Sequence, residues 1–274
     1  MIKPVNGMKD LMHRAMPRYR KVIEETRSVL EGRYGYQEVM PNLVESERLY
    51  RRTLGVTSDI VLKEMYEVVA ASTSITDKAG KVKDRNVLRP EGTAGVLRAI
   101  LRDTELMQNM RKETVKVWYW GPMFRHERPQ AGRLRQFYQV GMECVGGTKA
   151  GTADTAIDFG HTLQTDYETV ESAWSCLQGI FAETDSSSST LELQINNLGG
   201  GSTLTEYNKA LTSLMTPSLA DFSKASQERL QAGHSLRILD SKSDQDQQVL
   251  KSLSLPDIDH FIDSDWRDSF EDLL

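Results

Sequence analysis

Four arginines lie close together in the middle of this 274-residue chain. They are Arg125, Arg128, Arg133 and Arg135. An arginine is always charged, and its forked N–H donors match the oxygens of a phosphate. Because an aromatic ring, Phe137, and a carboxylate, Glu143, follow them, the cluster indicates a nucleotide polyphosphate lying across a sheet. A solvated, charged loop is the other interpretation that this spacing leaves open.

The residues on either side of the arginines predict the elements that would position them. Residues 115–124 and 136–145 are rich in aromatic and β-branched side chains, which favours two strands. Pro129 and Gly132 interrupt the polar segment between them, so neither strand can continue through it. The sequence therefore predicts a hairpin with a long loop that carries the arginines.

Period-two alternation sorts the second strand into two faces. One face carries Phe137, Gln139, Gly141 and Glu143, and the other carries Tyr138, Val140, Met142 and Cys144. The second set is apolar and is expected to face a core. The first set is expected to be a binding surface, with Gly141 allowing a ligand to come close to the backbone.

A second candidate site lies where a predicted strand, 86–89, meets a predicted helix, 93–102. The junction reads Arg89-Pro90-Glu91-Gly92-Thr93. Backbone N–H groups point outward at the start of a helix, so such junctions often bind ligands. An acid at a helix start that simply complements the helix dipole is the alternative interpretation of Glu91.

Three blocks together resemble class II aminoacyl-tRNA synthetases, in the variant found in histidyl-tRNA synthetases. The longest runs from Phe124-Arg125-His126-Glu127-Arg128-Pro129-Gln130 through Gly141-Met142-Glu143 and resembles the second signature motif. The 89–93 block resembles the family's Arg-Pro-Glu-Gly-Thr segment, and 35–41 resembles its first motif. The resemblance implies an α+β fold: an antiparallel sheet flanked by helices, with a mainly helical insertion.

The resemblance also implies a reaction, in which histidine is activated with ATP and Mg²⁺ to histidyl-adenylate and then transferred to tRNA(His). The histidine-binding residues would be Glu91, Gly92, Thr93, Arg125, Gln139 and Glu143. The ATP-binding residues would be Arg125, Glu127, Arg133 and Phe137, and the first three of these would be catalytic. Gln130 and Arg135 would meet the tRNA acceptor end. The first motif, through residues 17–41, would form a homodimer interface.

Composition limits the other expectations. Two cysteines, Cys144 and Cys176, give no disulfide framework and favour a cytoplasmic location, with an organelle left open. The five histidines lack zinc-ligand spacing, so no protein metal site is predicted, and no apolar run is long enough to predict a membrane span. The net charge of −5 indicates that any contact with nucleic acid is local to the arginine loop.

The predicted domains are 1–184, the N-terminal part of a class II catalytic domain, and 185–274, a mostly helical insertion. The family's later segments, a third motif and an anticodon-binding domain, are not found before Leu274. The favoured interpretation is therefore a truncated histidine–tRNA ligase whose activity has to be tested. Two alternatives stay open: a non-catalytic, histidine-sensing paralogue of the kind that regulates ATP phosphoribosyltransferase, and a structural partner that only dimerises.

Periodicity predicts the remaining elements. Helices are expected at 17–33, 46–54, 152–184, 204–214, 217–232, 245–252 and toward the end of the chain, 261–274. Strands are expected at 36–40, 62–69 and 190–195, with a turn within 71–85 and a short strand or turn at 235–242. The glycine-rich block 198–201 resembles a phosphate loop, but no arginine or lysine follows it closely, so it is interpreted as a turn that opens a helix.

Overall fold

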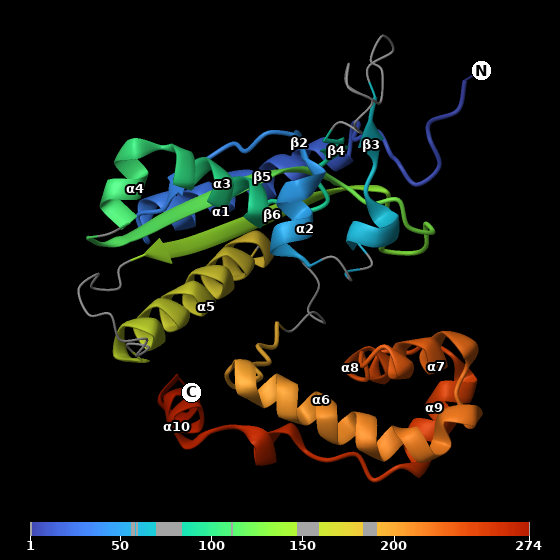
Figure 1. The fold of residues 1–274 in the computed structure, drawn as a ribbon. Helices are drawn as coiled ribbons and strands as arrows, with labels where there is room; N and C mark the ends of the chain where they lie inside the picture. Colours follow the sequence, from blue (N-terminus) through green and yellow to red (C-terminus); the bar gives the residue numbers. More distant parts are fainter. Residues whose placement is uncertain are drawn as a thin grey trace, which may run out of the picture. The chain divides into compact units, whose positions relative to one another are not determined.

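The computed structural model describes residues 2–55, 58, 60–69, 84–110, 112–146, 159–182 and 191–273. The chain forms two compact units, Met1–Leu191 and Glu192–Leu274 (Figure 1). The predicted boundary at 184/185 lies outside the described residues, and so does all of the predicted turn within 71–85 except its last two residues. The predicted mixture of helices with small, mainly antiparallel sheets is confirmed.

The first unit contains two three-stranded sheets. One has the order β1-β5-β6 and consists of β1 (Gln37–Glu38), β5 (Thr114–Phe124) and β6 (Gln136–Gly146). The other has the order β2-β4-β3 and consists of β2 (Val44–Ser46), β4 (Asn86–Leu88) and β3 (Glu67–Val68). β1 pairs with β5 in parallel, and every other pairing is antiparallel. The predicted hairpin thus forms the two long strands of the first sheet: β5 is the central strand and β6 is an edge strand.

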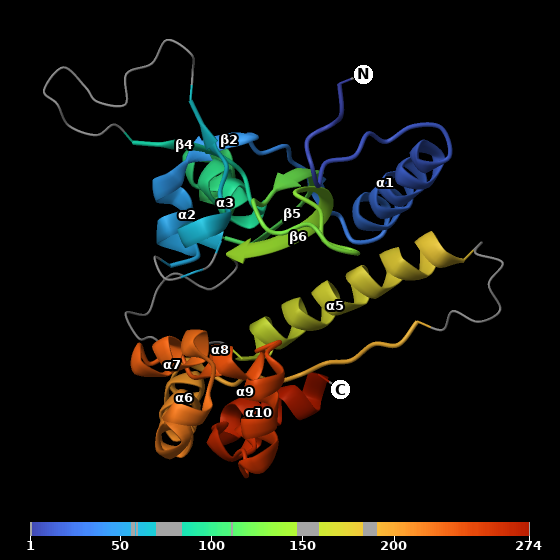
Figure 2. The same ribbon diagram turned by 90° about the vertical axis from the view of Figure 1, so that its right-hand side faces the viewer.

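Helices cover both faces of the β5–β6 hairpin (Figure 2). On one face, side chains of α3 (Thr93–Arg102) and α4 (Thr104–Met110) pack against alternate residues of β5. On the other face, α1 (Ala15–Gly32) and α5 (Phe159–Phe181) pack against Trp118 and its neighbours. Because Val140, Met142 and Cys144 are partly buried and pack against this second core, the prediction that their face meets a core is confirmed. Tyr138 departs from it, at 42% exposed.

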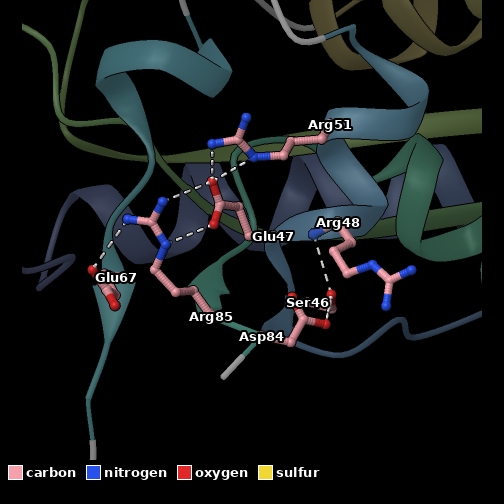
Figure 3. A network of polar contacts seen from close by, with 7 residues as sticks. All are labelled: Ser46, Glu47, Arg48, Arg51, Glu67, Asp84 and Arg85. Carbon is pink, nitrogen blue, oxygen red and sulfur yellow. Dashed lines mark hydrogen bonds and ion pairs between the residues drawn. The ribbon is translucent and has the colours of Figure 1, made fainter. Parts of the chain in front are cut away.

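A polar network holds the smaller sheet to α2 (Glu47–Thr53) (Figure 3). Glu47, which is buried, accepts hydrogen bonds from Arg51 at 2.7 Å and Arg85 at 3.4 Å and forms ion pairs with both. Ser46 caps the helix by accepting from the Arg48 amide at 3.1 Å and donates to Asp84 at 2.6 Å. This network fixes the start of α2 against the beginning of β4.

The second unit is helical. Its elements are α6 (Gly201–Met215), η2 (Thr216–Asp221), α7 (Lys224–Gln231), α8 (Leu236–Leu239), α9 (Asp244–Ser252), η3 (Ile258–Phe261) and α10 (Ser264–Leu273). Leu211, Met215, Phe222 and Ile238 are buried at its centre. The glycine-rich block is the turn that opens α6, with Gly200 as the N-cap residue, as predicted.

A buried carboxylate organises one end of the second unit. Asp246 is 0% exposed and accepts from the Ser223 amide at 2.6 Å. It also accepts from the hydroxyls of Ser223 at 2.8 Å, Ser226 at 2.7 Å and Ser241 at 2.5 Å. Burial alone would raise the pKa of Asp246, but these donors outweigh it and lower the pKa to about 2.

Four predicted elements differ in the structure. The predicted strand 62–69 begins inside a π-helical turn, Ile60–Glu64, and only Glu67–Val68 pairs as a strand. The predicted strand 190–195 is not a strand within its described part, because no described strand pairs with it.

The other two differences lie in the second unit. The predicted helix 217–232 is divided at Phe222, because the Ser223 amide donates to Asp246 and leaves the helical path. The short apolar run 235–242 contains α8 instead of a strand, and Ile238 is buried in the helical core. A short apolar run does not distinguish a strand from a buried helical turn.

We predict that Asp246→Asn destabilises the second unit by about 2–3 kcal/mol, because an amide cannot accept the same set of hydrogen bonds. The folded pKa of Asp246 lies below its ordinary value of 3.8, so its contribution is present above about pH 4 and is lost as the pH falls toward 2. Urea denaturation at several pH values measures both effects.

The matched control for this variant is Asp244→Asn, two residues earlier and exposed at the first turn of α9. Its effect on the free energy of unfolding should be small. If the two variants lose the same stability, or if the loss from Asp246→Asn does not shrink at low pH, the stabilising role assigned to the serine hydrogen bonds to Asp246 is wrong.

Candidate active site

Glu91 lies in the junction between β4 and α3, which the sequence singled out. Its carboxylate is 9% exposed and accepts a hydrogen bond from the Ala94 amide at 3.2 Å. Gly92 is the N-cap residue and Thr93 begins the helix. The helix N-terminus stabilises the Glu91 carboxylate, and Thr93 adds a hydroxyl on the same turn.

The β5–β6 register brings a tyrosine to this junction. Tyr119 is paired with Gly141, and a Cβ atom at Gly141 would overlap the tyrosine ring. A Cβ atom at Gly92 would overlap the same ring, so the ring is enclosed between the two glycines. Its hydroxyl lies 3.4 Å from the Thr93 hydroxyl. Sequence analysis missed Tyr119, although its place opposite Gly141 on the predicted hairpin could have indicated it.

Glu143 completes an acidic end of the site. Burial raises the pKa of Glu143, and the charge of Glu91 raises it further, while hydrogen bonds with Thr93 and Tyr119 lower it. The structure therefore brings Glu91, Thr93 and Glu143 together, although they come from two different sheets. Two partly desolvated carboxylates at one place create a site that favours a cation or a hydrogen-bond donor.

Gln139 faces the same side of β6 as Glu143. Its side-chain oxygen is buried and has no hydrogen-bond partner in the part of the chain that the structure describes. A buried acceptor without a donor costs about 1–3 kcal/mol. An N–H donor from a ligand would remove this cost, so the Gln139 oxygen is available as an acceptor on this face of β6.

A cavity of about 500 Å³ lies at the loop end of the hairpin. It is lined by Glu64, Arg125, Glu127, Gly132, Arg133, Leu134, Phe137 and Tyr138. Arg125 donates to the Pro90 carbonyl at 3.0 Å, and its guanidinium lies over the Phe137 ring, 5.0 Å from the centroid. Glu127 and Arg133 approach each other to 3.5 Å. Cations and a ring thus share one cavity, as the sequence predicted.

The two residues expected to contact tRNA lie at opposite ends of the loop, one at its tip and one at its base. Gln130 is exposed at the tip, where its amide donates to the Arg133 carbonyl at 3.1 Å. Arg135 lies at the base and donates to the Glu127 carbonyl at 3.0 Å. The loop also rests on the π-helical turn, because the His126 amide donates to the Glu64 carbonyl at 2.6 Å.

Among the described residues, no group of three or more His, Cys, Asp or Glu side chains is placed to hold a metal ion. No helix in the described ranges is both long and apolar enough to cross a membrane.

Comparisons with known proteins agree with this geometry. The family model for histidyl-tRNA synthetase matches residues 7–158, more than half of the chain. The chain belongs to the histidyl-tRNA synthetase family. A histidine–tRNA ligase of Francisella philomiragia is 36% identical over 267 residues, which are 97% of this chain and 55% of that protein. The chain spans about half the length of the curated relatives it matches.

Two solved structures share the fold. Apo histidyl-tRNA synthetase of S. aureus matches with a TM-score of 0.58 and 24% identity, covering 100% of this chain and 53% of that one. An ATP phosphoribosyltransferase regulatory subunit/histidyl-tRNA synthetase from Bacillus halodurans matches with a TM-score of 0.55 and 16% identity, covering 100% and 65%. At these identities the likeness concerns the synthetase fold alone.

We predict that Gly141→Ala destabilises the first unit by about 1–3 kcal/mol, because the new methyl group overlaps the Tyr119 ring. The same substitution should cost much less in a Tyr119→Ala background. Gly32→Ala is the control, since nothing lies within 4 Å of its added Cβ. Urea denaturation of the four variants provides the comparison. If Gly141→Ala lowers the free energy of unfolding equally with and without Tyr119, the ring is not enclosed as described.

We also predict that Glu143→Gln stabilises the unit at neutral pH. A carboxyl whose folded pKa is raised favours the folded state at low pH, and this advantage is lost as the pH rises through the folded pKa. The neutral amide avoids the loss, so the gain should grow from about pH 4.5 upward. Thermal denaturation across this range, with exposed Glu113→Gln as the control, tests the sign. A gain that is independent of pH would contradict the burial argument.

Proposed function

We propose that the chain carries the histidine- and ATP-binding part of a histidine–tRNA ligase. The observation that supports this most is the proximity of Glu143, on β6, to Glu91 and Thr93 at the start of α3, with the unpaired Gln139 oxygen on the same face of β6. Two carboxylates, a hydroxyl and an unpaired amide oxygen match a ligand with an ammonium group and a ring N–H. Histidine has both.

The roles follow from the position of each group. Glu91, Thr93 and Gln139 would hold the α-ammonium group, and Gly92, between the first two, leaves room for the Tyr119 ring beside them. Glu143 would accept a hydrogen bond from the imidazole, and an amino acid without that donor would leave this partly buried carboxylate without one of its hydrogen bonds. The specificity for histidine would therefore come from Glu143.

The ATP would lie in the cavity lined by Arg125, Glu127, Arg133 and Phe137. An oxygen of the histidine carboxylate attacks the α-phosphorus, the bond from that phosphorus to the β-phosphate bridge breaks, and pyrophosphate leaves. Arg125 would contact the α-phosphate and Arg133 the terminal phosphates, while Phe137 offers a ring for adenine. Such a reaction depends on alignment and on positive charge against the phosphate oxygens.

The donor set of the cavity fits a Mg²⁺ ion that arrives with ATP. The carboxylates of Glu64 and Glu127 line the same cavity as the arginines, and Mg²⁺ is usually held by one or two carboxylates together with phosphates and water. When bound, the ion would neutralise phosphate charge and so reduce repulsion between the triphosphate and these two glutamates.

Transfer to tRNA would use the exposed end of the hairpin loop. Gln130, at the tip, and Arg135, at the base, are the proposed contacts to the acceptor end. A homodimer is proposed through the first-motif region, where apolar side chains are exposed: Met40 is 77% exposed, Leu43 46% and Val44 40%. Large exposed apolar side chains in one stretch favour a protein–protein contact.

We predict histidine-dependent exchange between ATP and pyrophosphate by the purified chain. Arg125→Ala should reduce the exchange by at least about a hundredfold, since one preorganised donor to the phosphate contributes this much or more. Arg128→Ala, an exposed arginine in the same loop, is the matched control and should change the rate little.

Three other outcomes have distinct meanings. No exchange with retained binding of both histidine and ATP would limit the proposal to the binding part of the ligase. Histidine binding without ATP binding would favour a histidine-sensing regulator. Binding of neither ligand by a folded chain would overturn the proposed function.

A further inference from the structure

Arg89, the first residue of the 89–93 block, is buried next to the candidate active site, and none of the proposed roles involves it. Its residue exposure is 2%, one of the lowest values for a charged side chain in the described ranges. It donates to the Pro41 carbonyl at 2.8 Å and to the Pro122 carbonyl at 3.0 Å. These partners are backbone carbonyls rather than carboxylates, so the guanidinium bridges two chain segments by hydrogen bonds.

The backbone around Arg89 leaves room for its guanidinium. A Cβ atom at Gly121 would overlap the terminal nitrogen of Arg89, and Gly121 has a φ of +150°, which favours glycine. The Arg89 amide donates to the Leu43 carbonyl at 2.9 Å, and its carbonyl accepts from the Phe124 amide at 3.0 Å. The side chain and the backbone of one residue thus hold the same segments together.

The joined segments belong to different sheets. Arg89 follows β4 of the smaller sheet, whereas Pro122 and Phe124 belong to β5 of the larger one. Glu91 and Thr93 continue from Arg89, and Gln139 and Glu143 stand on β6 beside β5. The next residue, Pro90, accepts the hydrogen bond from Arg125. The two halves of the candidate site therefore meet at this residue.

We infer that Arg89 is a positioning residue, which sets the distance between the ammonium-binding half of the site and the half that carries Arg125 and Glu143. This inference rests on the proposed function. A lysine has one point-like ammonium group and cannot reproduce the planar fork to Pro41 and Pro122. Arg89 acts through Glu91 and Arg125 and touches no ligand itself.

The first test is Arg89→Lys, measured by amide hydrogen exchange without ligand. The Phe124 amide, which crosses between the sheets, and the amide of residue 89, which bonds to Leu43 next to β2, should exchange at least about tenfold faster. The amide of Leu30 in the buried core should change much less. Arg98→Lys is the matched control. Arg98 is a partly buried arginine that donates to a carboxylate, Glu45, at 2.6 Å, and not to backbone carbonyls of two chain segments.

The second test is a double-mutant cycle on histidine binding by calorimetry. Arg89→Lys and Glu91→Gln should each weaken binding by about tenfold or more, and the double variant should bind about as weakly as Glu91→Gln alone. Non-additivity is the expected result, because Arg89 is inferred to act through Glu91. A role in general stability alone would give additive losses and would speed exchange at Leu30 as much as at Phe124, which would overturn the inference.

The wild-type chain separates this inference from the proposed function. If it binds no histidine, the proposed function fails, and so does the positioning role in that site. If it binds histidine and Arg89→Lys binds equally well, with unchanged exchange at Phe124, the inference fails while the proposed function stands.

Discussion

The long antiparallel ladder between β5 and β6 is the constraint on which the rest of the first unit depends. Its register pairs Tyr119 with Gly141 and Met123 with Phe137, and thereby decides which side chains face α3 and which face α1 and α5. A shift by one residue would move the whole set to the opposite face. The glycine opposite Tyr119 leaves room for that ring to cross the strand, so the register and the shape of the site are set together.

The candidate site contains groups that the fold does not stabilise. Glu143 is a buried carboxyl with another carboxylate nearby, and the Gln139 oxygen lacks a partner among the described residues. These features lower stability, and a ligand with an ammonium group and a ring N–H would compensate for them. In the second unit, Asp246 shows the opposite case, since its four hydrogen bonds satisfy a buried charge completely enough to lower its pKa. The contrast separates a carboxylate whose hydrogen bonds hold a fold together from the carboxylates that we propose bind a ligand.

Much of this arrangement could be predicted from the sequence because the signals were local. The hairpin, its two faces, the helix at 93–102 and the cap at Ser46 follow from alternation, helical period and capping chemistry. The failures depend on contacts far apart in the chain. The segment after Ile60 turns because its backbone meets the hairpin loop at His126, and the helix after Pro217 breaks because Asp246 captures an amide. The positions of Tyr119 and Arg89 in the site were not predicted for the same reason. The role of each depends on contacts with residues that are distant in the sequence.

The central claim is that two sheets contribute to one histidine-binding site. A crystal structure of the chain grown with histidine tests it most directly. The claim predicts the α-ammonium group within hydrogen-bond distance of Glu91, Thr93 and the Gln139 oxygen, and the imidazole N–H directed at Glu143. Histidine bound away from these residues, or a folded chain whose site stays empty at saturating histidine, would contradict it.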